Sequence, residues 1–207
     1  MTVSYLQKLH LLNHDVRRFL LTAALVGFVW DGVRAVLLNL YLLRLGYGPE
    51  FIGLINAVGL LVFALACLPA GALGTRWGSQ RLILVALGLL LLGSGLLPLP
   101  VGLPGRGQAW WLVVTMAVAY VGLAVYFVNG LPFLMGATGP ADRDHAFAAQ
   151  VALTPLAAFA GSLVAGILPG VIAAALGLSL QDPMVYRYPL LLSSLLLLPG
   201  LLVLIPA

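Results

Sequence analysis

Six long runs of apolar residues, separated by short polar segments, limit what this 207-residue chain can fold into. A helix needs about 20 mostly apolar residues to cross the hydrocarbon of a bilayer. The chain is 62% hydrophobic and 8% charged, whereas a soluble domain carries about 25% charged residues. The runs are continuous, whereas the strands of a membrane β-barrel alternate between polar and apolar residues. The sequence therefore predicts an all-α integral membrane protein.

The six predicted transmembrane helices cover residues 18–45, 51–73, 81–99, 109–135, 147–176 and 188–205. Together they form one bundle over residues 18–207. Residues 1–17 are charged, lack a cleavage site of small residues, and precede a run too long for a signal peptide. We expect them to form a cytoplasmic amphipathic lead-in that lies along the membrane interface.

The distribution of basic residues predicts the orientation, because cytoplasmic loops carry an excess of Lys and Arg. With six spans, one side of the membrane holds Lys8, Arg17, Arg18, Arg76, Arg81 and Arg143. The other side holds Arg44, Arg106 and Arg187. We therefore expect a multi-pass protein of the plasma (inner) membrane with both termini in the cytoplasm.

The net charge of +4 does not indicate nucleic-acid binding, because the basic residues are scattered singly. The sequence has no phosphate-binding loop, no nucleophile beside a base and no zinc pattern. We therefore expect no cofactor, no metal site and no enzyme activity. The expected partners are the lipid bilayer and a small-molecule solute.

Asp31 and Arg34 interrupt the first apolar run near its middle. Ionisable residues at this depth are costly, and they usually face a bundle interior or a water path where they have a function. The spacing of three residues places both on one face of a regular helix. We expect Asp31 to carry a proton or bind a cation, and Arg34 to contact an anionic group or tune Asp31. The alternative is a structural pair whose charges neutralise each other.

The segment between the second and third runs resembles a family signature. It reads Gly-Ala-Leu-Gly-Thr-Arg-Trp-Gly-Ser-Gln-Arg over residues 71–81. It is similar to the loop between helices two and three of the major facilitator superfamily. The residues that fit the signature are Gly71, Leu73, Gly74, Arg76, Trp77, Gly78 and Arg81. Thr75 stands where the family usually has Asp, so it brings no charge to this position.

Two further segments, 39–47 and 129–147, resemble the end of helix one and the junction of helices four and five in the same family. The resemblance covers the whole chain. It implies a six-helix half of a twelve-helix carrier, built from two inverted three-helix repeats. It also implies a cavity lined by spans one, two, four and five. The candidate substrate or proton-coupling residues are Asp31, Arg34, Asn39, Asn56 and Tyr126.

Small residues recur four apart in the fifth run, as Gly161 and Ala165 and as Gly166 and Gly170. Small residues at this spacing let membrane helices approach closely. We expect these four to pack against a neighbouring helix. In the signature segment, Gly71 and Gly74 are expected to do the same, and Gly78 to allow the chain to reverse.

We predict that the chain is the N-terminal half of a secondary active transporter that moves a small solute by alternating access. A second six-helix half would complete it, either a C-terminal half or a second copy. The chain could be a piece of a longer protein or a natural half-size one. The alternative function is a membrane scaffold or subunit that pairs with another half without transport. An enzyme is disfavoured because Asp31 is the only acidic residue well inside a predicted span.

Overall fold

The computed structural model describes residues 13–100, 105–140 and 142–205. These residues form six helices that are long and apolar enough to cross a membrane. The predicted lead-in lies outside the described residues up to position 12, and the first helix begins at His14. The predicted all-α membrane fold is confirmed.

The first span, His14–Arg44, is continuous but not uniform. It consists of α2 (His14–Val26), the π-helix η1 (Gly27–Arg34) and α3 (Ala35–Arg44). The sixth span joins α8 (Met184–Leu195) to α9 (Leu197–Leu204). The four other spans are α4 (Pro49–Trp77), α5 (Ser79–Leu96), α6 (Gly105–Ala137) and α7 (Arg143–Leu176).

The helices begin earlier than the apolar runs predict, for example at Arg143 in α7 rather than at residue 147. Asp15 and Asp144 lie in the first turns of α2 and α7. Acidic residues stabilise the positive end of the helix dipole. Hydropathy alone does not count these turns because they extend beyond the hydrocarbon region.

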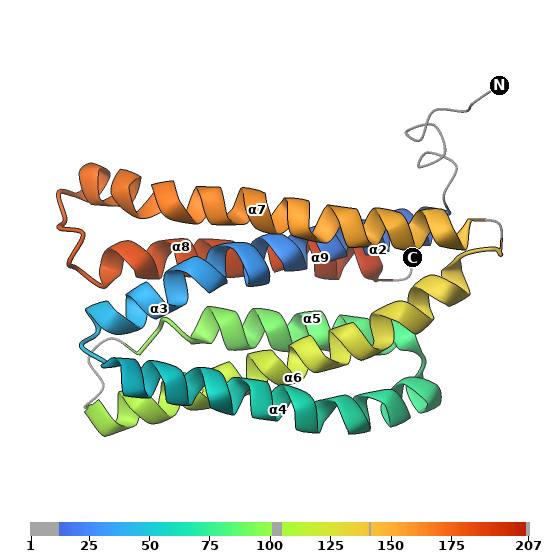
Figure 1. Ribbon diagram of the computed structural model, residues 1–207, viewed down its shortest axis with the longest axis horizontal. Helices are drawn as coiled ribbons and strands as arrows, with labels where there is room; N and C mark the ends of the chain where they lie inside the picture. Colours follow the sequence, from blue (N-terminus) through green and yellow to red (C-terminus); the bar gives the residue numbers. More distant parts are fainter. Residues whose placement is uncertain (1–12, 101–104, 141, 206–207) are drawn as a thin grey trace.

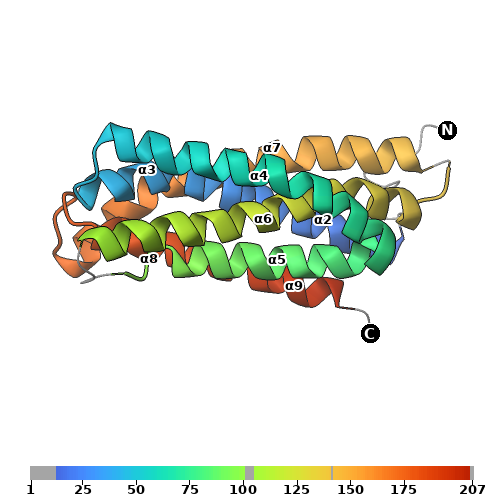
Figure 2. The same cartoon turned by 90° about the horizontal axis from the view of Figure 1, so that it is seen from below.

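The helices run side by side in two tiers (Figures 1 and 2). In Figure 2, α4 and α7 lie on one face, and α5 and α9 lie on the opposite face. Figure 1 shows α4 and α7 at opposite edges of the bundle. The first span and α6 fill the centre, where 56% of the apolar window of each is buried. The corresponding shares are only 11% in α4 and 22% in α7. We call the face that carries α4, the first span and α7 the α4–α7 face.

The two ends of the bundle are distinguished because the candidate sites are placed relative to them. The start of α2 and the connection between α4 and α5 lie at one end. The connections α3–α4 and α7–α8 lie at the other, which we call the distal end.

Candidate functional site

The first span changes to a π-helix over Gly27–Arg34, the segment that contains Asp31 and Arg34. A π-helix has i→i+5 hydrogen bonds and is rare, and short π segments inside α-helices frequently mark functional sites. The sequence pattern predicted a regular helix here. The change of helix type affects which side chains share a face.

Close packing of η1 against α7 accompanies the π-helix. A Cβ added at Gly27 would lie 2.6 Å from the Thr154 carbonyl oxygen, and one at Gly32 would lie 2.7 Å from the Ala158 oxygen. From the other side, a Cβ at Gly161 would collide with the Phe28 carbonyl oxygen. Only glycine fits at these three positions, so backbone meets backbone along this contact.

Asp31 is exposed on the surface of the chain. Its carboxylate interacts electrostatically with Arg34. The described residues show no ion pair between the two, whereas Asp15 and Arg18 near the start of the same span do pair, at 3.7 Å. The alternative of a structural pair is therefore not supported by a direct contact, and the exposed Asp31 carboxylate is accessible to other groups.

Arg34 instead contacts aromatic rings and a thioether. Its guanidinium carbon lies 3.7 Å from the centre of the Trp30 ring and 5.5 Å from that of Tyr120. Its Nη1 donates to the Met116 sulfur at 3.7 Å. Its Nε is buried with no hydrogen-bond partner among the described residues. The prediction that Asp31 and Arg34 share one face assumed a regular helix, whereas the π-helix spreads these positions around a wider turn.

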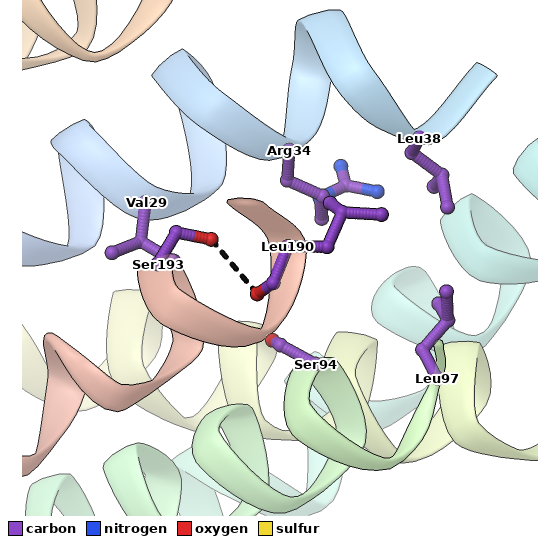
Figure 3. A pocket seen from close by; sticks show the side chains of 7 residues that line it. All are labelled: Val29, Arg34, Leu38, Ser94, Leu97, Leu190 and Ser193. Atoms are coloured by element: carbon purple, nitrogen blue, oxygen red, sulfur yellow. Dashed lines mark hydrogen bonds between the residues drawn. The ribbon is translucent and has the colours of Figure 1, made fainter. Parts of the chain in front are cut away.

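Arg34 also borders a narrow cavity between the first span, α5 and α8 (Figure 3). The cavity is about 10 Å³, roughly the space that one water molecule needs. The hydroxyls of Ser94 and Ser193 line it, but each donates to a carbonyl of its own helix, Leu90 and Leu190. Arg34 therefore lies on the side of η1 that faces the bundle interior, while Asp31 is exposed.

Asn39 and Asn56 meet at the contact between α3 and α4. The Asn56 amide nitrogen lies 3.3 Å from the Asn39 side-chain oxygen, to which it donates. It also donates to the Ile52 carbonyl oxygen at 2.8 Å. Asn39 is exposed, and it lies two helical turns beyond Asp31. Both asparagines thus lie beside α4 on the α4–α7 face, which also includes the first span that carries Asp31.

Tyr126 does not lie on this face. It is 4% exposed, its ring stacks on Phe19 with centroids 6.0 Å apart, and its hydroxyl lies 3.5 Å from the Thr22 hydroxyl. Tyr126 therefore packs between α2 and α6 inside the bundle. Hydropathy could not predict this, because α6 is apolar on all sides.

The signature segment is mostly helical in the structure. α4 continues through Leu73, Thr75 and Arg76 to Trp77, and α5 begins at Ser79. Only Gly78 lies between the two helices, with a φ of 85° in the left-handed region that favours glycine. Arg76 and Arg81 are exposed on either side of this turn.

Gly71 and Gly74 differ in their surroundings. A Cβ at Gly74 would collide with the Asn129 side-chain oxygen, whereas one at Gly71 would make ordinary contact with Val128 at 3.7 Å. The Asn129 amide nitrogen donates to the Ala70 carbonyl oxygen at 3.3 Å, which links α6 to α4. The expected close contact between backbones is therefore absent at both glycines, because α6 presents the side chains of Val128 and Asn129 to them.

The small residues of the fifth span divide into two groups. Gly161 and Ala165 are buried, and Gly161 packs against η1 as described. Gly166 and Gly170 are exposed, with open space where a Cβ would lie. Gly166 and Gly170 therefore do not pack against another described helix of this chain, so the prediction that they would do so is wrong.

Trp30, Met116 and Tyr120 surround Arg34. Hydropathy and residue spacing do not predict these three as a set. One signal was present, because Trp30 precedes Arg34 by four residues. Residues four apart are neighbours on an α-helix. No sequence pattern connects either residue to α6, which only the fold brings alongside.

Six membrane-length helices around a buried centre, with an ionisable residue near the middle of the first, define an integral multi-pass membrane protein. Residues 19–207 match the family model described as Major Facilitator Superfamily, so the chain belongs to this family, whose members are transporters. No similar sequence is found among curated proteins.

Proposed function

We propose that the chain is one half of a secondary active transporter that moves a small solute by alternating access. The observation that carries the proposal is the exposed carboxylate of Asp31 within a membrane span. A charged side chain facing lipid at this depth is unfavourable, so such residues face a polar cavity or a partner. Asp31 would bind and release a proton or cation as the cavity opens to each side.

The character of the α4–α7 face is the evidence for a second six-helix half. α4 and α7 flank it and are the least buried spans of the bundle. Asn39 and Asn56 supply further polar groups beside α4. A partner bundle packed over α4 and α7 would enclose Asp31 in a shared cavity. The partner is either a C-terminal half or a second copy of this chain.

The mass of the purified protein in mild detergent tests the pairing. Light scattering with the detergent contribution subtracted should give about twice the 21.8 kDa of the chain if two copies pair. A monomer would contradict self-pairing and leave a separate C-terminal half as the proposed partner.

Transport is tested in vesicles that contain the complete assembly and a pH-sensitive dye. A panel of sugars, amino acids, organic acids and cationic drugs is added outside, and proton movement is recorded. We expect at least one solute to move protons in the wild type and none to do so in Asp31→Asn.

Asp15→Asn is the matched control, because Asp15 is an acidic residue of the same span near its end, paired with Arg18 at 3.7 Å. It should retain the flux. Equal flux and equal pH dependence in wild type and Asp31→Asn would refute the coupling role. Stable pairing without flux of any solute would favour the scaffold instead.

A further inference from the structure

A second cavity lies at the distal end of the bundle, apart from the Asp31 site. It has a volume of about 280 Å³, near the lower end of the range for small-molecule pockets. The end of the first span, the start of α6 and the α7–α8 connection surround it. Its lining residues are Tyr41, Leu45, Gln108, Asp182, Pro183, Met184 and Arg187.

Arg187 brings a positive charge to this cavity without a strong acceptor. Its Nε is buried and has no hydrogen-bond partner among the described residues. Its Nη1 donates to the Met184 sulfur at 3.5 Å, and a thioether is a weak acceptor. A guanidinium in such surroundings favours a carboxylate, which two parallel N–H groups can bind.

Asp182 brings a negative charge to the same cavity. One carboxylate oxygen accepts a hydrogen bond from the Met184 backbone N–H at 2.9 Å. The other has no hydrogen bond to a described residue. The described residues show no ion pair between Asp182 and Arg187. Two opposite charges therefore line one cavity while remaining apart.

The other polar side chains that line the cavity, Tyr41 and Gln108, already form hydrogen bonds within the protein. The Tyr41 hydroxyl donates to the Pro98 carbonyl oxygen at 3.3 Å. The Gln108 side chain donates to the Pro100 oxygen at 2.9 Å and accepts from the Tyr47 hydroxyl at 3.1 Å. The remaining walls are apolar. The cavity thus offers one anion-binding group, one cation-binding group and an apolar surface.

We propose that this cavity binds a small apolar amino acid as a zwitterion. The ligand carboxylate binds the Arg187 guanidinium, and its ammonium group binds the free oxygen of Asp182. Its side chain contacts Leu45, Pro183 and Met184. A molecule with both charges satisfies both residues at once, whereas a simple anion leaves Asp182 opposed to its own charge.

Binding to the purified full chain tests this proposal, with L-alanine, propionate and ethylamine as the probes. Propionate lacks the ammonium group of alanine, and ethylamine lacks its carboxylate. We expect L-alanine to bind at least tenfold more tightly than either. Equal affinity for propionate and alanine, or no binding of alanine, would overturn the proposal.

Two variants locate the site. Arg187→Lys keeps the charge but loses the two parallel donors, and Asp182→Asn keeps the oxygen that accepts from Met184 but loses the charge. Each should weaken alanine binding at least tenfold. Arg106→Gln, which changes an exposed arginine at the same end, is the control and should bind as the wild type does.

Melting temperatures of the variants show whether they are folded. If Arg187→Lys does not fold, the loss of alanine binding in Asp182→Asn tests the proposal. Alanine binding that is lost in Asp31→Asn but unchanged in Asp182→Asn would assign the ligand to the other site and overturn the proposal.

Discussion

The guanidinium of Arg34 stacks over the indole ring of Trp30, with its central carbon 3.7 Å from the ring centre. No carboxylate among the described residues lies within ion-pair distance of Arg34. A desolvated cation over a tryptophan ring gains about 2 kcal/mol. The aromatic contact thus stabilises the buried charge inside the bundle, while Asp31 remains exposed.

A double-mutant cycle between these two residues should show this coupling. Trp30→Leu and Arg34→Met are compared singly and together by unfolding the protein in mild detergent with increasing dodecyl sulfate. We expect a coupling energy of about 2 kcal/mol, because either change removes the same cation–ring contact. The exposed neighbours Arg76 and Trp77 provide a control cycle, in which the coupling should be near zero. Equal coupling in both cycles would contradict the proposed stabilisation.

The contact of η1 with α7 predicts a sharp difference between glycines. Gly32→Ala would place a Cβ 2.7 Å from the Ala158 oxygen and 2.8 Å from the Gly161 Cα. Backbone atoms cannot yield as side chains do, so we expect a loss of about 1–3 kcal/mol in the free energy of unfolding.

Gly166→Ala is the matched control, because its added methyl group meets open space on α7. Its stability should equal or slightly exceed that of the wild type, since alanine favours helix over glycine. Thermal unfolding in the same detergent compares the two. If the two variants have the same stability, backbone contact does not set the packing of η1 on α7.

The spans could be predicted from the sequence because the bilayer fixes their length and apolar character. Where a helix is apolar on all sides, the sequence does not predict which side faces the bundle interior. Tyr126 is the example, since its polar hydroxyl indicated a cavity while its ring packs in the core. The reversal at Gly78 could be anticipated because glycine permits the tight turn that a short connection needs.

The contacts of Arg34 could not be predicted from the sequence for a different reason. Reasoning from helical spacing assumes 3.6 residues per turn, and η1 departs from this over the segment that contains Asp31 and Arg34. The glycines that accompany this departure are visible in the sequence, but their partners on α7 are more than a hundred residues away. Only the fold brings them together.

The link between Asn129 and α4 predicts that Gly74 tolerates no side chain. Gly74→Ala would displace the Asn129 amide and break its hydrogen bond to Ala70. The amide would then remain buried with one bond fewer, which costs about 1–3 kcal/mol. Gly71→Ala, one turn earlier, has room and should be neutral. Unfolding in detergent measures both, and equal losses would show that helix propensity rather than the Asn129 contact matters.

The distribution of arginines predicts which end of the bundle faces the cytoplasm. In a background with Cys67→Ala, which removes the only cysteine, single cysteines replace Ser179 at the distal end and Asp142 at the opposite end. Both positions are exposed. Because basic residues concentrate beside the Asp142 end, a membrane-impermeant maleimide applied to intact cells should label Ser179→Cys only. Asp142→Cys should react after the membrane is made permeable. The reverse pattern would place the distal cavity, with Asp182 and Arg187, on the cytoplasmic side.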